Sequence, residues 1–341
     1  MSARDAYRFI NELDEPTVQS LINRLEFRGT DPAFTRWRDD YLDRLGLGPA
    51  ATVLDLGCGT GVATRALAGR ADFDGRVMGV DQSPTLLEAA MRLAARDDVA
   101  ERTEFQVGDA GRLDLPDAAF DAVIAHTTIS HVADPLAMLR EAARVARPGA
   151  LVAIFDGDYA SWTFDHPDER LAATMDAAII AAVVNNPRVL RAMPRLLEEA
   201  GLEREQTLAY VYADIGNGAF YASAIEAYTP LAVRAGLASE EQAHTWLDHQ
   251  RRAMATGSFF GACNYYTYLA RQPGTPRLRI RRCWSSLRPP PQVVVTGRRA
   301  GLRRGRPAWS HSRGGGGCRA AGGGVRPGCR RRRGGTPWRR A

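Results

Sequence analysis

Apolar residues recur with two different spacings along the first 273 residues of the chain. Runs of consecutive apolar residues predict buried strands, and apolar spacings of three and four predict helices. The predicted strands cover 52–56, 76–81, 103–108, 119–125, 150–156, 207–213 and 259–269. The predicted helices cover 61–69, 84–95, 134–147, 168–184, 187–200, 219–236 and 239–255. Strands that alternate with helices of this length predict a parallel sheet with right-handed crossovers.

The stretch before the first strand predicts a helical cover over residues 1–47. Residues 5–46 have helical spacing, and Pro16 and Gly29 are expected to interrupt it. Aromatic and leucine side chains repeat there at intervals of three and four: Phe34, Trp37, Tyr41 and Leu45. Such a face could lie over the edge of the sheet, or it could be ordinary core.

Residues 53–61 read VLDLGCGTG, an apolar strand that runs into a glycine turn. The glycines stand at alternate positions, Gly57, Gly59 and Gly61. Glycine lets the backbone take positive φ and lets a ligand lie against the main chain. A dinucleotide-binding loop needs glycines at its first, third and sixth positions, but the sixth position here is Val62. Asp55 would also repel a pyrophosphate, whereas it suits a cationic ligand. The pattern therefore argues against a dinucleotide site.

The same run resembles motif I of the class I S-adenosylmethionine-dependent methyltransferases, whose cofactor carries an ammonium and a sulfonium but no phosphate. The resemblance implies an α/β fold over 48–273, with a Rossmann-like seven-stranded sheet that is mostly parallel and has one antiparallel strand. Helices on both faces and a helical substrate cap would complete it. The resemblance implies S-adenosylmethionine as the cofactor and a cofactor-binding role for residues in the turn: Asp55, Gly57, Cys58, Gly59 and Gly61. For Cys58 we expect packing under the loop rather than nucleophilic catalysis.

Polar residues follow the next two predicted strands. In open α/β sheets the ligand lies beyond the carboxyl ends of the strands. Asp81 ends the second strand and could accept hydrogen bonds from both ribose hydroxyls, while Ser83 is the better-placed helix cap. Gln82 is assigned to the same site. Asp109 and Ala110 resemble the adenine-binding turn of the family, although Asp109 could instead form an Asx-turn.

Two histidines follow the fourth predicted strand, in FDAVIAHTTISHVADP (120–135). This segment resembles the corresponding region of ubiquinone- and menaquinone-biosynthesis methyltransferases and their small-molecule relatives, which often carry paired histidines here. His131 matches one of the pair, and Ser130 replaces the other. We expect His126 and His131 to be candidate catalytic residues, with His126 also contacting the cofactor, because histidine can act as a base near neutral pH. The alternative is that both are hydrogen-bonded structural residues.

The acceptor is not specified by these motifs. A small molecule, either a secondary metabolite or a quinone-like compound, is the leading hypothesis, and a cofactor-binding protein without catalysis is an alternative. Aromatic residues that could hold an acceptor, or could simply be core, are Tyr7, Trp37, Tyr159, Trp162 and Tyr221.

Charge divides the chain into two parts. Residues 1–273 contain all 39 acidic side chains and 26 arginines, whereas 274–341 contain 19 arginines and no acid. An acidic domain argues against a nucleic-acid surface. The Arg/Gly/Pro-rich segment 274–341 is expected to be disordered. It is interpreted either as an RNA-binding arm of an RNA methyltransferase or as GC-rich sequence translated out of frame.

Other features exclude further classes of function. The cysteines form no CxxC pair, so we expect neither a structural metal nor a disulfide framework. No apolar run is long enough for a membrane span, and the N-terminus does not resemble a signal peptide. A cytoplasmic location is therefore expected, and the oligomeric state is left open.

Overall fold

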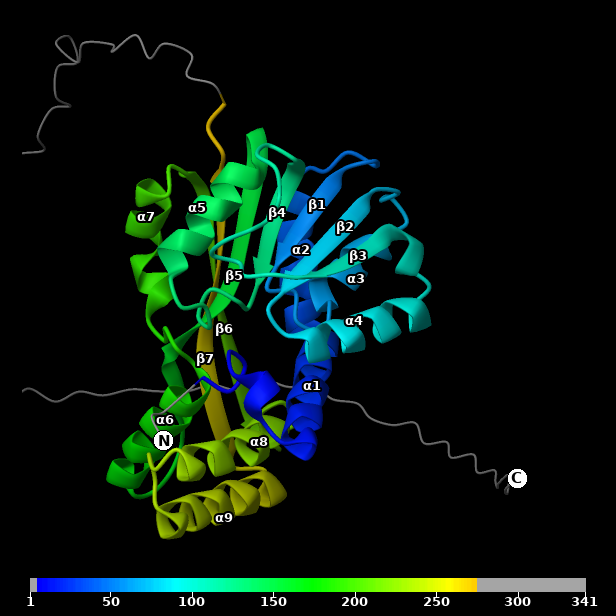
Figure 1. Cartoon of the computed structure of the whole chain (residues 1–341). Helices are drawn as coiled ribbons and strands as arrows, with labels where there is room; N and C mark the ends of the chain where they lie inside the picture. The colour runs from blue at the N-terminus through cyan, green and yellow to red at the C-terminus, as the bar shows by residue number, and fades with distance from the viewer. Residues whose placement is uncertain (1–4, 275–341) are drawn as a thin grey trace, which may run out of the picture. The chain divides into compact units, whose positions relative to one another are not determined.

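The computed structural model describes residues 5–274, which contain a seven-stranded mixed sheet (Figure 1). The strand order is β3-β2-β1-β4-β5-β7-β6. Only β7 runs antiparallel to its neighbours, since it pairs antiparallel with both β5 and β6. The strands are β1 (Thr52–Leu56), β2 (Arg76–Asp81), β3 (Thr103–Val107), β4 (Phe120–His126), β5 (Ala146–Phe164), β6 (Glu203–Gly216) and β7 (Phe259–Arg271). The predicted sheet, with its single antiparallel strand, is confirmed.

Nine α-helices accompany the sheet within residues 5–274. Most begin at an Asp or Ser side chain that accepts a hydrogen bond from the first turn, as predicted for Ser83 before α4. Pro16 lies in the first turn of α1 and starts that helix rather than interrupting it. The helices are α1 (Glu15–Thr30), α2 (Pro32–Arg44), α3 (Val62–Ala68), α4 (Pro84–Arg96), α5 (Pro135–Val145), α6 (Glu169–Val183), α7 (Val189–Glu199), α8 (Tyr221–Arg234) and α9 (Glu240–Thr256). Two short 3-10 helices are η1 (Ile10–Glu12) and η2 (Ala100–Arg102).

The break between α1 and α2 also differs from the prediction. Gly29 remains helical, and the chain turns at Asp31 instead. Asp31 has extended backbone angles, and its carboxylate accepts hydrogen bonds from the first turn of α2. A side chain that caps the next helix ends this one more effectively than a glycine that lies within it.

The two faces of the sheet bury separate cores. Val53 and Ile124 belong to the core that also contains residues of α1 to α4. Their chain neighbours Leu54 and Val123 belong to the core under α5 and α7. Adjacent strand residues point to opposite faces, so parallel strands covered on both sides need continuous apolar runs. This explains why the strands carry no polar alternation.

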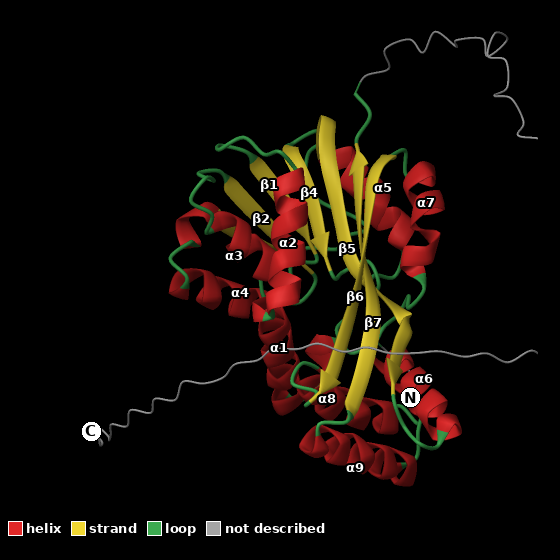
Figure 2. Cartoon of the chain, turned by 180° about the vertical axis from the view of Figure 1, so that it is seen from behind, coloured by secondary structure: helices red, strands yellow, loops and turns green. Residues whose placement is uncertain are grey.

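Three long strands carry the chain beyond the parallel part of the sheet. β5, β6 and β7 continue into a lobe formed by α6, α8 and α9 (Figure 2). The prediction that the fifth strand ends at residue 156 was wrong. The sequence GDYASWTF that follows contains turn-forming residues, which favoured a strand end at that point. Pairing with β7 instead extends β5 to Phe164, across a register irregularity between Asp158 and Thr163.

The basic C-terminal segment cannot be compared with its prediction. The segment 275–341, with its two interpretations, lies outside the described residues. Within 5–274, no helix has both the length and the apolar character that crossing a bilayer requires.

Two neighbouring phenylalanines test the packing of the helical lobe. Phe259 is buried at 1% exposure against Phe164 and Tyr221, whereas Phe260 on the opposite face of β7 is 38% exposed. Phe259→Ala is expected to lower the free energy of unfolding by about 3–5 kcal/mol, because it leaves a cavity in a packed core. Phe260→Ala is the matched control and is expected to change it by about 1 kcal/mol or less. Urea denaturation of both variants makes the comparison, and equal losses would contradict this packing.

Candidate active site

The glycine turn after β1 is held close to the neighbouring strands. The Gly57 amide donates to the Val80 carbonyl (2.7 Å), and the Gly57 carbonyl accepts from the Thr128 hydroxyl (2.9 Å). Gly57 has a φ of +64°, and a Cβ built there would lie 2.1 Å from Cγ2 of Thr128. Both the backbone angle and the lack of space therefore require glycine at this position.

A cavity of about 170 Å³ opens beside this turn. By the same measure a single water needs roughly 10–15 Å³, so the cavity can hold an organic ligand. Nearly all residues proposed from the sequence line it: Asp55, Gly57, Cys58, Gly59, Asp81, Gln82, Asp109, Ala110, His126 and His131. Gly61 is the exception; it precedes α3 with a φ of +76° and shapes the turn from behind.

Asp55 is a buried carboxylate with one unused oxygen. Its Oδ2 accepts a hydrogen bond from the Thr64 hydroxyl (2.7 Å), while Oδ1 is buried without a partner in the described residues. Burial raises the pKa of Asp55 to about 7, despite the opposing hydrogen bond from Thr64. A cation in the cavity would favour the charged carboxylate. Asp55 thus provides a place for a positively charged group.

Asp81 joins the end of β2 to the glycine turn. Its Oδ2 accepts from the Gly59 amide (2.8 Å), and its Oδ1 accepts from the Ser83 amide (2.9 Å). Burial raises the pKa of Asp81, and the backbone hydrogen bonds oppose that rise. Each carboxylate oxygen can accept a second hydrogen bond, so the side chain remains able to bind two neighbouring hydroxyls.

The turn after β3 provides a further part of the wall. Asp109 Oδ1 accepts from the Gly111 amide (2.8 Å), which is the Asx-turn considered as the alternative role. Asp109 and Ala110 both line the cavity. An Asx-turn therefore positions this aspartate and does not exclude a role in binding.

The two histidines have different surroundings. His126 stacks on Phe155 (ring centroids 4.9 Å apart), and its Nδ1 lies 3.0 Å from the Tyr41 hydroxyl. Burial, with Arg28 and Arg38 nearby, lowers the pKa of His126 well below its usual value. The neutral form of His126 is therefore favoured, and its ring position is fixed by packing.

His131 is hydrogen-bonded to a residue from the start of the chain. Its Nδ1 donates to Oδ2 of Asp5 (2.7 Å), which also accepts from the Asn185 amide (2.9 Å). Burial lowers the pKa of His131, but the charge and hydrogen bond of Asp5 outweigh it and leave the pKa raised. With Nδ1 bound to Asp5, the neutral ring carries its lone pair on Nε2. This arrangement is suited to accepting a proton.

Cys58 does not have the surroundings of a nucleophile. Burial raises the pKa of its thiol well above the usual value, and Asp81 and Asp55 add to the effect. Its sulfur lies close to Gly79, where an added Cβ would be only 2.7 Å away. The predicted packing role under the loop is consistent with this position. Within residues 5–274, no group of three acidic, histidine or cysteine side chains is arranged to hold a metal.

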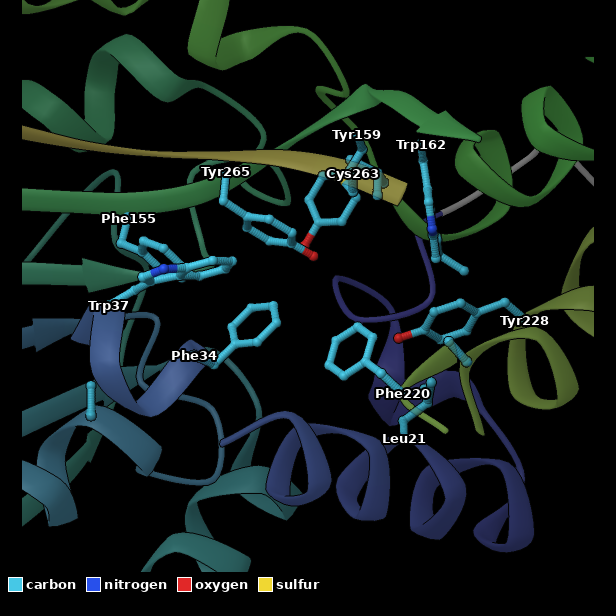
Figure 3. Close-up of a cluster of buried hydrophobic side chains, with 14 of the residues drawn as sticks. Leu21, Phe34, Trp37, Phe155, Tyr159, Trp162, Phe220, Tyr228, Cys263 and Tyr265 are labelled. Atoms are coloured by element: carbon cyan, nitrogen blue, oxygen red, sulfur yellow. The ribbon is translucent and has the colours of Figure 1, made fainter. Parts of the chain in front are cut away.

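A second, smaller cavity of about 20 Å³ adjoins the first. Tyr7, Arg28 and His131 line both cavities. Figure 3 shows Tyr159, Tyr228 and Tyr265 with their hydroxyls directed toward the middle of the aromatic cluster. The remaining lining residues are Arg24, Trp162, Val183, Val184 and Tyr221.

Four of the five aromatic residues considered for the acceptor line this second cavity. Trp37 is the exception, because it stacks on Tyr210 (4.8 Å) and packs against Phe34. Sequence reasoning missed Asp5, Arg28, Tyr228 and Tyr265. They come from the two ends of the described chain, and no local motif marks them; only the fold brings them to His131.

Comparisons with known proteins agree with this geometry. Residues 54–154 match the family model of a methyltransferase domain. The chain is 30% identical over 270 residues to an uncharacterised 37.1 kDa protein in transposon TN4556 of Streptomyces fradiae, which covers 79% of this chain and 76% of that protein. It is 36% identical over 126 residues to the 27-O-demethylrifamycin SV methyltransferase of Amycolatopsis mediterranei, covering 37% of this chain and 46% of that enzyme.

A solved structure supports the fold. A Bacillus halodurans protein assigned as a methyltransferase has a TM-score of 0.51 at 18% identity, over 69% of this chain and 98% of that one. The matched methyltransferase domain, the strand order and the glycine-turn cavity together show that the chain belongs to the class I S-adenosylmethionine-dependent methyltransferases.

Proposed function

We propose that the chain transfers a methyl group from S-adenosylmethionine to a small-molecule acceptor, with His131 as the general base. The observation that carries this proposal is the position of His131, which lines both the larger cavity beside the glycine turn and the smaller tyrosine-lined cavity. The cofactor occupies the first cavity, and the acceptor reaches His131 from the second. The related rifamycin enzyme, named for a small-molecule acceptor, supports this class of substrate.

The residues in the larger cavity fit this cofactor. Asp55 offers its unpartnered oxygen to the ammonium, Asp81 offers two carboxylate oxygens to the ribose hydroxyls, and Asp109 with Ala110 borders the adenine. When bound, S-adenosylmethionine supplies a methyl group carried by a sulfonium. The sulfur departs as a neutral thioether once the methyl group is transferred. The surrounding residues provide alignment and exclude water, and these effects supply most of the rate gain in a displacement.

His131 is needed when the acceptor atom carries a proton. In its neutral form, Nε2 takes that proton while Asp5 holds the ring by Nδ1 and stabilises the resulting imidazolium. A phenol or an enolisable carbon needs such a base. We further propose that the protein acts in the cytoplasm, as the sequence predicts.

Binding of S-adenosylhomocysteine provides the direct test of the cofactor site. We expect the wild type to bind it and Asp81→Ala to bind it about 10- to 100-fold more weakly, because hydrogen bonds to a charged group contribute about 1.5–3 kcal/mol. Asp72→Ala, an exposed acid outside the cavity, is the control and should bind normally. Calorimetry gives the affinities, and circular dichroism verifies the fold. Wild-type protein that binds the cofactor but methylates nothing across a broad metabolite panel would favour the non-catalytic alternative.

Asp55 predicts a link between pH, stability and binding. Its folded-state pKa of about 7 exceeds the unfolded value of about 3.9, so the folded protein holds this proton more tightly. Its contribution to the free energy of unfolding is therefore complete below about pH 4 and is lost as the pH rises toward 7. In Asp55→Asn the free energy of unfolding should not fall in this way. The variant should therefore become more stable relative to the wild type as the pH rises from about 4 toward 7.

The same variant should bind S-adenosylhomocysteine about 10-fold more weakly, since it loses a charged partner for the ammonium. Denaturation at pH 5 and pH 7.5, with calorimetry at pH 7.5, measures both effects. Glu104→Gln on β3 is the exposed control. Parallel stability curves and unchanged affinity would show that Asp55 has neither role.

The His131–Asp5 pair predicts a shift in pH dependence. Asp5 raises the pKa of His131, so Asp5→Asn should lower that pKa. NMR titration of the His131 ring in the ligand-free protein measures the change directly. Once an acceptor is identified, the acid limb of the rate profile should move to lower pH in Asp5→Asn and disappear in His131→Asn. An NMR pKa that Asp5→Asn leaves unchanged would rule out this coupling.

A further inference from the structure

We propose that the acceptor carries a carboxylate and that this group enters the tyrosine-lined cavity and pairs with Arg28. The inference rests on the proposed function, since it assigns the second cavity to the acceptor. It names a substrate class that the methyltransferase motifs do not specify.

Arg28 stands where the two cavities meet, in the last turn of α1. One guanidinium nitrogen, NH2, donates to the Thr127 hydroxyl at 2.7 Å. A guanidinium has five N–H donors in a planar fork, so most of this fork is available to a ligand. Arg28 lines both cavities, so a ligand in either one can reach it.

No acidic side chain compensates this charge. Among residues 5–274, none of the residues lining the second cavity is an Asp or Glu, and no carboxylate lies within ion-pair distance of Arg28. Arg28 is partly buried, and a charge that is shielded from water without a partner is unfavourable. An anionic ligand would supply the missing partner.

A second arginine lies one turn earlier on the same helix. Arg24 is 5% exposed, and its NH1 donates to the Phe220 carbonyl (2.7 Å) and the Ser223 hydroxyl (3.2 Å). Its guanidinium lies 4.1 Å from the centre of the Phe220 ring. Arg24 is therefore held by neutral groups, and its charge adds to the positive potential of the cavity.

Four tyrosines, Tyr7, Tyr159, Tyr228 and Tyr265, line the second cavity together with Arg28. Tyr7 and Tyr228 already share a hydrogen bond of 2.7 Å. Hydroxyls can donate to an anionic oxygen, so this ring of groups can complete the coordination of a carboxylate.

The size of the cavity favours a small planar anion. About 20 Å³ accommodates little more than one water-sized group, so only the oxygen end of a carboxylate would enter, while the rest of the acceptor remains beside the cofactor. A carboxylate also matches the guanidinium fork in a bidentate pair. A phosphate group has more terminal oxygens and a greater charge than a carboxylate, so it fits this small cavity and its single guanidinium fork less well.

The carboxylate of the cofactor itself is the competing partner, because Arg28 also lines the larger cavity. The position of the surrounding hydroxyls favours the acceptor. Tyr159, Tyr228 and Tyr265 line the second cavity and are absent from the lining of the first. Three tyrosines thus border Arg28 on the acceptor side alone, whereas Thr127 contacts it from the larger cavity.

The test uses simple probes with the full-length protein saturated with S-adenosylhomocysteine. Acetate and benzoate are titrated alongside acetamide and benzamide, with binding followed by NMR. We expect the carboxylates to bind at least about 10-fold more tightly than the amides. Arg28→Met should remove this preference, and Arg28→Lys should keep part of it. Arg36→Met, on an exposed position of α2, is the matched control and should behave as the wild type.

The other outcomes each overturn the proposal. Carboxylates that bind Arg28→Met as well as wild type would exclude Arg28, and inorganic phosphate that binds while both carboxylates fail would exclude the carboxylate. If Arg28→Met weakens S-adenosylhomocysteine but not methylthioadenosine, which lacks the amino-acid tail, Arg28 holds the cofactor instead. Failure of wild type to bind S-adenosylhomocysteine would count against the proposed function, so the two failures are distinguishable.

Discussion

The close contact between the glycine turn and the two neighbouring strands determines the geometry of the whole site. Gly57 donates to β2 through Val80 and accepts from Thr128 beyond β4, so one residue joins three strand ends. Because a side chain at this point would collide with Thr128, the turn can only close with glycine. The cavity exists because this closure brings the ends of β1, β2 and β4 to one edge.

Uncompensated charge is the second constraint. Asp55 is a buried and Asp81 a partly buried carboxylate, and loss of contact with water raises the pKa of each, while Arg28 is a guanidinium without an acidic partner among the described residues. Such groups oppose folding in the absence of a ligand. A zwitterionic cofactor and an anionic acceptor would relieve both signs of charge at once. Binding would therefore stabilise the native state as well as position the reactants.

The parts of the structure that sequence predicted are those with local signals. The glycine turn, Asp81 and the histidines each follow a recognisable strand, and most of their side chains meet at one cavity. Asp5 and Arg28 lie in a segment interpreted only as a helical cover, and Tyr265 lies in a strand that seemed ordinary. Their roles depend on long-range contacts, such as the pairing of Asp5 with His131 across 126 positions of sequence. The end of β5 was missed for the same reason, because β7 rather than local propensity extends it.

The residues assigned to the cofactor and those that line the second cavity lie in different parts of the chain. The matched methyltransferase domain spans residues 54–154 and includes the residues assigned to the cofactor. Of the residues that line the second cavity, His131 alone falls inside that span. The other lining residues come from the N-terminal segment, the extended part of β5, strand β7 and helices α6 and α8. Relatives that share only the domain therefore inform the chemistry of methyl transfer, whereas the acceptor site that we propose is enclosed by the long strands and helices around His131.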